Sequence, residues 1–154
     1  MMVFYQCFGR AHTSIVAAHL HLGTLPMAGP PRIAQLMALP FFDRAKKEDL
    51  GKPLYFGTDD GGHRIYAIGL GATPRTGLGV IHGIMRCAQR DDELLVVNTL
   101  RGLSIMGRIG GGLSRELGLV AIGRPMVAYG VKLVFPTLVQ TVVSVKRILK
   151  EVAR

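Results

Sequence analysis

The chain has 154 residues, and its 19 lysines and arginines against 10 aspartates and glutamates give a formal net charge of +9. This length predicts one domain, residues 1–154, and the hydrophobic fraction of 49% excludes a mainly disordered chain. Glycine is in excess, with 20 residues where about 7% of a chain is usual. Glycine-rich turns are therefore the first places to search for function.

Cysteine usage and hydropathy predict a cytoplasmic protein. The two cysteines, Cys7 and Cys87, form no C-x-x-C pair, which argues against a disulfide framework, a zinc ribbon or a thioredoxin-like redox centre. The chain starts without a basic leader, so export is not expected. The apolar stretch at residues 131–145 is interrupted by polar residues and is shorter than the roughly 20 residues that span a bilayer, so we expect no membrane partner.

The first half of the chain predicts a strand, two helices and a hairpin. An apolar run at residues 3–8 predicts a buried strand, and helical spacing of apolar residues from Ser14 to Leu22 predicts the helix that follows. A short helix is expected between prolines, through residues 31–39. Strands at residues 54–58 and 64–68 flank an Asp-Asp-Gly-Gly turn, which is typical of a tight antiparallel hairpin.

The second half predicts helices alternating with short buried strands. One amphipathic helix is expected around residues 78–88, and a strand at residues 94–97. Residues 104–117 predict a helix despite three consecutive glycines, and residues 119–122 predict a further buried strand. An apolar stripe through residues 138–152 predicts the last helix.

These elements predict an α/β fold. Continuously apolar strands that alternate with helices are typical of a sheet covered on both faces, so we expect a three-layer sandwich. The sheet should be mostly parallel, with the antiparallel hairpin at its flank. Right-handed crossovers bring the carboxyl ends of parallel strands to one edge, where ligands of open α/β sheets bind. Three loops leave that edge, and we expect the functional site among them.

The first loop runs from Cys7 through a Gly-Arg-Ala-His segment into a predicted helix. Backbone N–H groups and the helix dipole favour an anion at such a helix start. In an enzyme, His12 would serve as acid or base, and Cys7 would be a nucleophile or a bystander. The predicted anion-binding residues of this loop are Gly9, Arg10, Thr13 and Ser14.

This first loop matches the known phosphate-binding loop motifs only in part. It lacks the second glycine and the lysine of a Walker loop. Its Cys7 lies at a strand end before a helix, as in the Cys-x-x-x-x-x-Arg loop of cysteine phosphatases, but Thr13 stands where the arginine should be. That position therefore lacks the bidentate phosphate fork. In the alternative interpretation, Cys7 is a buried core thiol and Ser14 only caps the helix.

The second and third loops each follow a predicted strand. Asn98 and Thr99 begin the second loop, and Arg124 lies in the third, Gly-Arg-Pro, where a guanidinium can clamp phosphate or carboxylate. The alternative for Arg124 is a surface arginine paired with a carboxylate. No metal site is predicted, because His19 and His21 would point in different directions on a helix. The sequence identifies no cofactor.

The motifs in these loops resemble one family across nearly the whole chain. They are YQCFGRAHTS at residues 5–14, its continuation AAHLHLGTLP at 17–26, LPFFD at 39–43, the glycine-rich 109–115 and IGRP at 122–125. The sequence resembles short bacterial proteins, mostly from Gram-positive spore formers, catalogued as the domain of unknown function number three thousand one hundred and eighty-nine.

The resemblance implies a single bacterial cytoplasmic domain and assigns no activity. In the family, the strand before the second loop ends in Asp-Thr, whereas this chain has Asn98-Thr99. That departure puts a metal-binding or general-base role at this position in doubt.

The leading hypothesis is a protein that binds a phosphorylated or other anionic small molecule at the carboxyl edge of the sheet, with phosphoryl-group chemistry if it is an enzyme. The rival is a non-catalytic regulatory protein whose +9 charge contacts nucleic acid or an acidic partner. Net charge alone does not choose between them.

Overall fold

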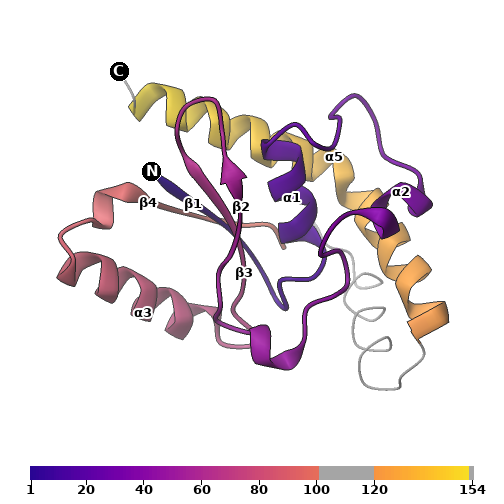
Figure 1. Ribbon diagram of the computed structural model, residues 1–154, viewed down its shortest axis with the longest axis horizontal. Helices are drawn as coiled ribbons and strands as arrows, with labels where there is room; N and C mark the ends of the chain where they lie inside the picture. Colours follow the sequence, from indigo (N-terminus) through magenta and orange to yellow (C-terminus); the bar gives the residue numbers. More distant parts are fainter. Residues whose placement is uncertain (101–119, 153–154) are drawn as a thin grey trace.

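The structure of the protein is a computed structural model that describes residues 1–100 and 120–152 (Figure 1). The helix predicted at residues 104–117 lies outside the described residues. Two short 3₁₀ turns, Lys47–Asp49 and Asp91–Glu93, accompany the main elements. The strands are β1 (Met2–Cys7), β2 (Leu54–Thr58), β3 (Arg64–Gly69) and β4 (Leu94–Asn98), and the helices are α1 (Thr13–His21), α2 (Ile33–Ala38), α3 (Pro74–Cys87) and α5 (Val120–Val152).

The four strands form one sheet in the order β2-β3-β1-β4. β1 runs parallel to β3 and β4, whereas β2 and β3 pair antiparallel at the flank. Their turn is built as the Asp-Asp-Gly-Gly pattern predicts, because Asp59 Oδ1 accepts the N–H groups of Gly61 and His63 and Gly62 has a φ of +77°. The mostly parallel sheet with an antiparallel hairpin at its flank is therefore confirmed.

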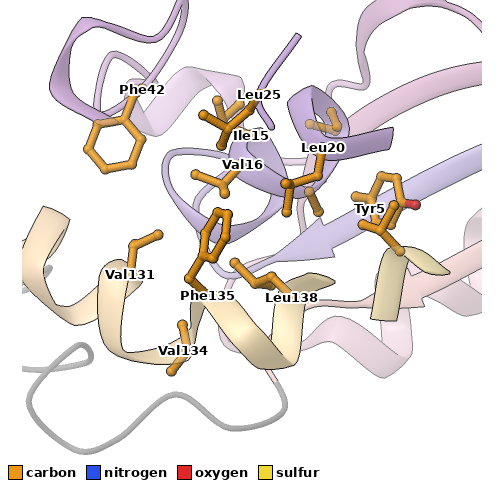
Figure 2. Close-up of a cluster of buried hydrophobic side chains, with 14 of the residues drawn as sticks. Tyr5, Ile15, Val16, Leu20, Leu25, Phe42, Val131, Val134, Phe135 and Leu138 are labelled. Atoms are coloured by element: carbon orange, nitrogen blue, oxygen red, sulfur yellow. The ribbon is translucent and has the colours of Figure 1, made fainter. Parts of the chain in front are cut away.

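The larger hydrophobic core joins one face of the sheet to α1 and α5. Side chains alternate along β1, so Val3 and Tyr5 belong to this core. Every residue of α1 is buried, because this short helix lies against both the sheet and α5. Figure 2 shows Phe135 and Leu138 of α5 directed toward the α1 side chains, among them Val16.

A smaller core lies on the opposite face of the sheet. Phe4 of β1 and Ile68 of β3 pack there with partly buried α3 side chains, including Leu78 and Ile81. Burial is less complete on this side, since no residue of α3 is fully buried. The two clusters place described helices against both faces.

The strand predicted at residues 119–122 is wrong, because α5 begins at Val120 and continues as helix to Val152. A short apolar run is compatible with either a buried strand or a buried helix segment. The apolar stripe that packs on the core, from Val127 to Leu149, recurs at helical spacing and extends the last predicted helix upstream. Arg124 consequently lies on a helix instead of in a loop.

The length of α5 also bears on the expected absence of a membrane partner. Its segment Arg124–Val152 is long and apolar enough to cross a membrane, with a mean hydropathy of 1.5 in its most apolar window. Of that window, 44% is buried inside the protein, and buried core helices of soluble proteins also meet these criteria. The absence of a membrane partner stays a prediction.

Candidate functional site

The carboxyl end of β1 leads through residues 8–12 into α1, and the predicted site residues surround this connection. Thr99, just after β4, contacts the first turn of α1. Arg124 reaches the same region from α5 through Asp43. The structure therefore brings the first and second loops together and adds a helix residue in place of the third loop.

Cys7 and Ser14 form a buried pair. The Cys7 sulfur lies 3.0 Å from the Ser14 hydroxyl, and the cysteine residue is 4% exposed. Ser14 does not cap the helix, because His12 is the N-cap residue and makes no side-chain cap hydrogen bond. The core-thiol interpretation of Cys7 fits this geometry, whereas the capping role of Ser14 is wrong.

Thr13 and Thr99 are also buried and tie three elements together. The Thr99 N–H and hydroxyl each lie 2.9 Å from the carbonyl oxygen of Gln6, and the two threonine hydroxyls are 2.9 Å apart. Asn98 is exposed, and its side-chain oxygen accepts the N–H of Leu100. These contacts fix the end of β4 against β1 and α1, so both threonine hydroxyls already have protein partners.

Arg10 has a left-handed backbone, with a φ of 54°, and its guanidinium is held by the protein. One terminal nitrogen lies 2.9 Å from Asp49 and the other donates to the carbonyl of Lys52 at 2.9 Å. The side chain is 11% exposed. An anion would have to compete with these partners, so Arg10 is better placed to anchor the loop than to bind a ligand.

Gly9 is buried where the loop passes over the end of β3. A Cβ atom at Gly69 would lie 2.6 Å from the Arg10 nitrogen and 2.7 Å from the Gly9 carbonyl carbon. Backbone hydrogen bonds from Leu70 to the Cys7 carbonyl and from Gly71 to the Phe8 carbonyl continue the pairing. The close backbone approach requires glycine at position 69 and gives the loop a defined path.

His12, Asp43 and Arg124 form the polar cluster of the site. Asp43 Oδ1 lies 2.9 Å from His12 Nε2, and its Oδ2 lies 3.4 Å from Arg124 Nε. A carboxylate only accepts, so the Nε2–H of His12 is the donor and a neutral ring has its lone pair on Nδ1. The Asp43 side chain is 6% exposed, against 19% for His12 and 30% for Arg124.

A family model for a protein of unknown function, DUF3189, matches residues 2–147. The chain belongs to this family. All nine predicted site residues and Asp43 fall within the matched region. No curated protein and no solved structure matches the chain. Membership in DUF3189 confirms the resemblance and leaves the activity to be inferred from the site.

Asp43 is the residue that sequence reasoning missed. It opens the charged stretch at residues 43–49, and its backbone N–H donates to the Ala11 carbonyl at 2.8 Å with a φ of 55°. Phe42 beside it is fully buried and contacts the His12 ring, with centroids 5.4 Å apart. The usable signal was the aromatic pair before the aspartate, because buried aromatics hold the next residue near the core. The Arg124 contact fulfils the alternative of an arginine paired with a carboxylate.

Proposed function

We propose that this protein binds a small molecule carrying a phosphate or carboxylate group at the amino end of α1, between His12 and Arg124. We also propose that the helices on the two faces of the sheet make the fold a three-layer sandwich. The observation that carries the binding proposal is the Asp43 carboxylate, which holds His12 on one oxygen and Arg124 near the other.

The helix end supports an anion because the first turn of α1 carries no acidic residue that would compensate the helix dipole. α1 has no acidic residue in its first turn and no side-chain cap on its first N–H groups. These groups and the positive end of the dipole attract negative charge. Arg124 adds a cation whose buried Nε makes no hydrogen bond among the described residues and lies 3.4 Å from Asp43 Oδ2. Its planar fork suits phosphate and carboxylate.

His12 supports acid–base chemistry at the same place. With its Nε2–H directed to Asp43, the ring is fixed in one tautomer and Nδ1 can take up or release a proton. In phosphoryl-group chemistry, Arg124 would stabilise charge on the phosphoryl oxygens while His12 transfers a proton. The buried Cys7 thiol bonded to Ser14 is a bystander in this scheme.

A panel of phosphorylated metabolites and carboxylates, screened by thermal shift at fixed ionic strength, tests this proposal. A specific ligand raises the stability by RT ln(1 + [L]/Kd). For the ligand found, Arg124→Ala should weaken binding by about 1.5–3 kcal/mol, as expected for a hydrogen bond to a charged group. Arg147→Ala is the matched control, since it removes an exposed arginine from the same helix.

Equal effects of the two variants would place the ligand on a diffuse positive surface and refute the site. If both variants instead keep small-anion binding and lose polynucleotide retention together, the rival function of nucleic-acid binding is favoured. Polynucleotide retention should then fall steeply with salt.

A further inference from the structure

An open hollow of about 300 Å³ lies at the opposite end of the sheet from α1's amino end. Three elements form its walls: the carboxyl end of α1, the β2–β3 turn and the last turns of α5, which lie together near the C-terminus in Figure 1. The turn precedes the first residue of β3, so this is the amino end of the parallel strands. The hollow shares no residue with the His12, Asp43 and Arg124 cluster.

A buried polar chain makes one wall of the hollow rigid. The Tyr5 hydroxyl lies 2.7 Å from His21 Nδ1, and His21 Nε2 lies 2.9 Å from Asp59 Oδ2. Burial lowers the pKa of His21 despite the hydrogen bond to Asp59, so the ring is neutral near pH 7. Because Asp59 can only accept, Nε2 carries the proton and the Tyr5 hydroxyl donates to Nδ1.

The Asp59 carboxylate is already hydrogen-bonded within the protein. It accepts from His21 and from the N–H groups of Gly61 and His63. Burial raises the pKa of Asp59, but the hydrogen bonds from His21 and from the His63 N–H, together with the two histidine side chains, outweigh burial and the net shift is downward, which keeps the carboxylate charged. The hydrogen bonds from Tyr5 through His21 to Asp59 fix the turn to β1 and to α1, so a ligand does not have to order the lining of the hollow.

Three further charged side chains line the hollow, and they come from two different elements. Lys146 and Lys150 line the hollow from α5, and Asp60 lines it from the turn. In the part of the chain that the structure describes, none of the three has an ion-pair partner within 4.0 Å. Lys146 is close enough to His21 for its charge to contribute to the lowered histidine pKa.

We propose that this hollow is a second binding site, for a small molecule that carries a phosphate or carboxylate at one end and an ammonium or hydroxyl donor at the other. Lys146 and Lys150 bind the anionic group, and Asp60 accepts from the donor. Leu149, which is buried, adds an apolar side chain to the lining of the hollow. The volume is at the lower end of the range for small-molecule sites, which suits a ligand of a few heavy atoms.

O-phosphoethanolamine is the test probe, with inorganic phosphate and ethanolamine as its two halves, all at one ionic strength. In ¹H–¹⁵N correlation spectra of the full chain, we expect it to shift the amide signals of Gly61 and His63. It should bind about two- to fivefold more tightly than inorganic phosphate, because Asp60 adds an exposed charge pair. If the probe does not shift the Gly61 and His63 amide signals of the wild type, the proposal is refuted before any variant is made.

Variants then separate the two ends of the probe. The double variant Lys146→Met with Lys150→Met should weaken phosphoethanolamine binding at least about tenfold. Asp60→Asn should remove the advantage over inorganic phosphate and leave phosphate binding itself intact. Arg147→Met is the matched control, an exposed cation beside Lys146 that does not line the hollow.

Two outcomes would show that these lysines are only solvated charges near a helix end. One is a double variant that binds like the wild type, and the other is an equal loss in Arg147→Met. Arg124→Ala distinguishes this site from the proposed function, because it should leave the Gly61 and His63 shifts unchanged. A negative result for the hollow therefore does not refute the proposed site at the amino end of α1, and a negative result for that site does not refute the hollow.

Discussion

Substitution of Asp43 should loosen the candidate site by an amount that its contacts define. Its charged hydrogen bond with His12, at 2.9 Å and nearly buried, should contribute about 1.5–3 kcal/mol. The contact with Arg124 is longer, at 3.4 Å, and that side chain is 30% exposed, so we assign it at most about 1 kcal/mol. Because the backbone φ of Asp43 is 55°, a substituted alanine costs about a further 1 kcal/mol in this left-handed conformation, whereas asparagine costs little.

Asp43→Ala should therefore lower the free energy of unfolding by about 2.5–5 kcal/mol. Asp43→Asn should cost only about 1–2 kcal/mol, because its carbonyl oxygen still accepts from His12, while the charge and the weaker contact with Arg124 are lost. Chemical denaturation monitored by circular dichroism measures both values. A double-mutant cycle with His12→Ala should give a coupling of about 1–2 kcal/mol.

Asp60→Asn is the matched control for these variants, since Asp60 is exposed and should change the stability by less than about 0.5 kcal/mol. The reasoning is refuted if Asp43→Ala costs no more than this control. A vanishing coupling between His12 and Asp43 would separately show that their contact does not stabilise the loop.

Three further predictions concern the core. Iodoacetamide should label the exposed Cys87 in the native protein and Cys7 only on unfolding, because Cys7 is 4% exposed; equal rates would show that the first loop opens readily. Phe135→Ala should cost about 3–5 kcal/mol in a denaturant titration, whereas Leu133→Ala, at a side chain 52% exposed on the same helix, should cost less than about 0.5 kcal/mol. Equal losses there would contradict the described packing of α5. Burial lowers the pKa of His21 below its ordinary 6.5, so the unfolded chain takes up a proton at a higher pH than the folded protein does. The free energy of unfolding should therefore fall as the pH drops below 6.5. His21→Gln should weaken this pH dependence, and a variant with the same pH profile as the wild type would refute the assignment to His21.

Local patterns predicted the elements that local chemistry determines. The Asp-Asp-Gly-Gly turn specifies its own hairpin, because the aspartate side chain and a positive-φ glycine build it within five residues. The start of α5 was mispredicted because a four-residue apolar run carries no period that separates strand from helix. Asp43 was missed for a different reason. Its contact with Arg124 joins residues far apart in the chain, so no short pattern encodes it.

The hollow near the turn was missed for the same reason. His21 was weighed only as a metal ligand with its neighbour His19, whereas its partners are Tyr5, from the preceding strand, and Asp59, from the hairpin turn. Sequence spacing places a histidine on a helix, but it does not say which of its nitrogens meets which partner. Only the tertiary structure supplies that information.

The packing of α1 against α5 has a consequence for how the chain acquires its fold. α1 is synthesised near the beginning, yet Val16 and Leu20 are covered by Phe135 and Leu138, more than a hundred residues later. Contacts of such sequence separation form slowly, because a long loop must close first. Until α5 has been made, the nascent chain therefore leaves the apolar side chains of α1, such as Val16 and Leu20, uncovered on an open sheet. Such a surface attracts chaperones and favours aggregation, so folding yield should depend strongly on the synthesis and docking of α5.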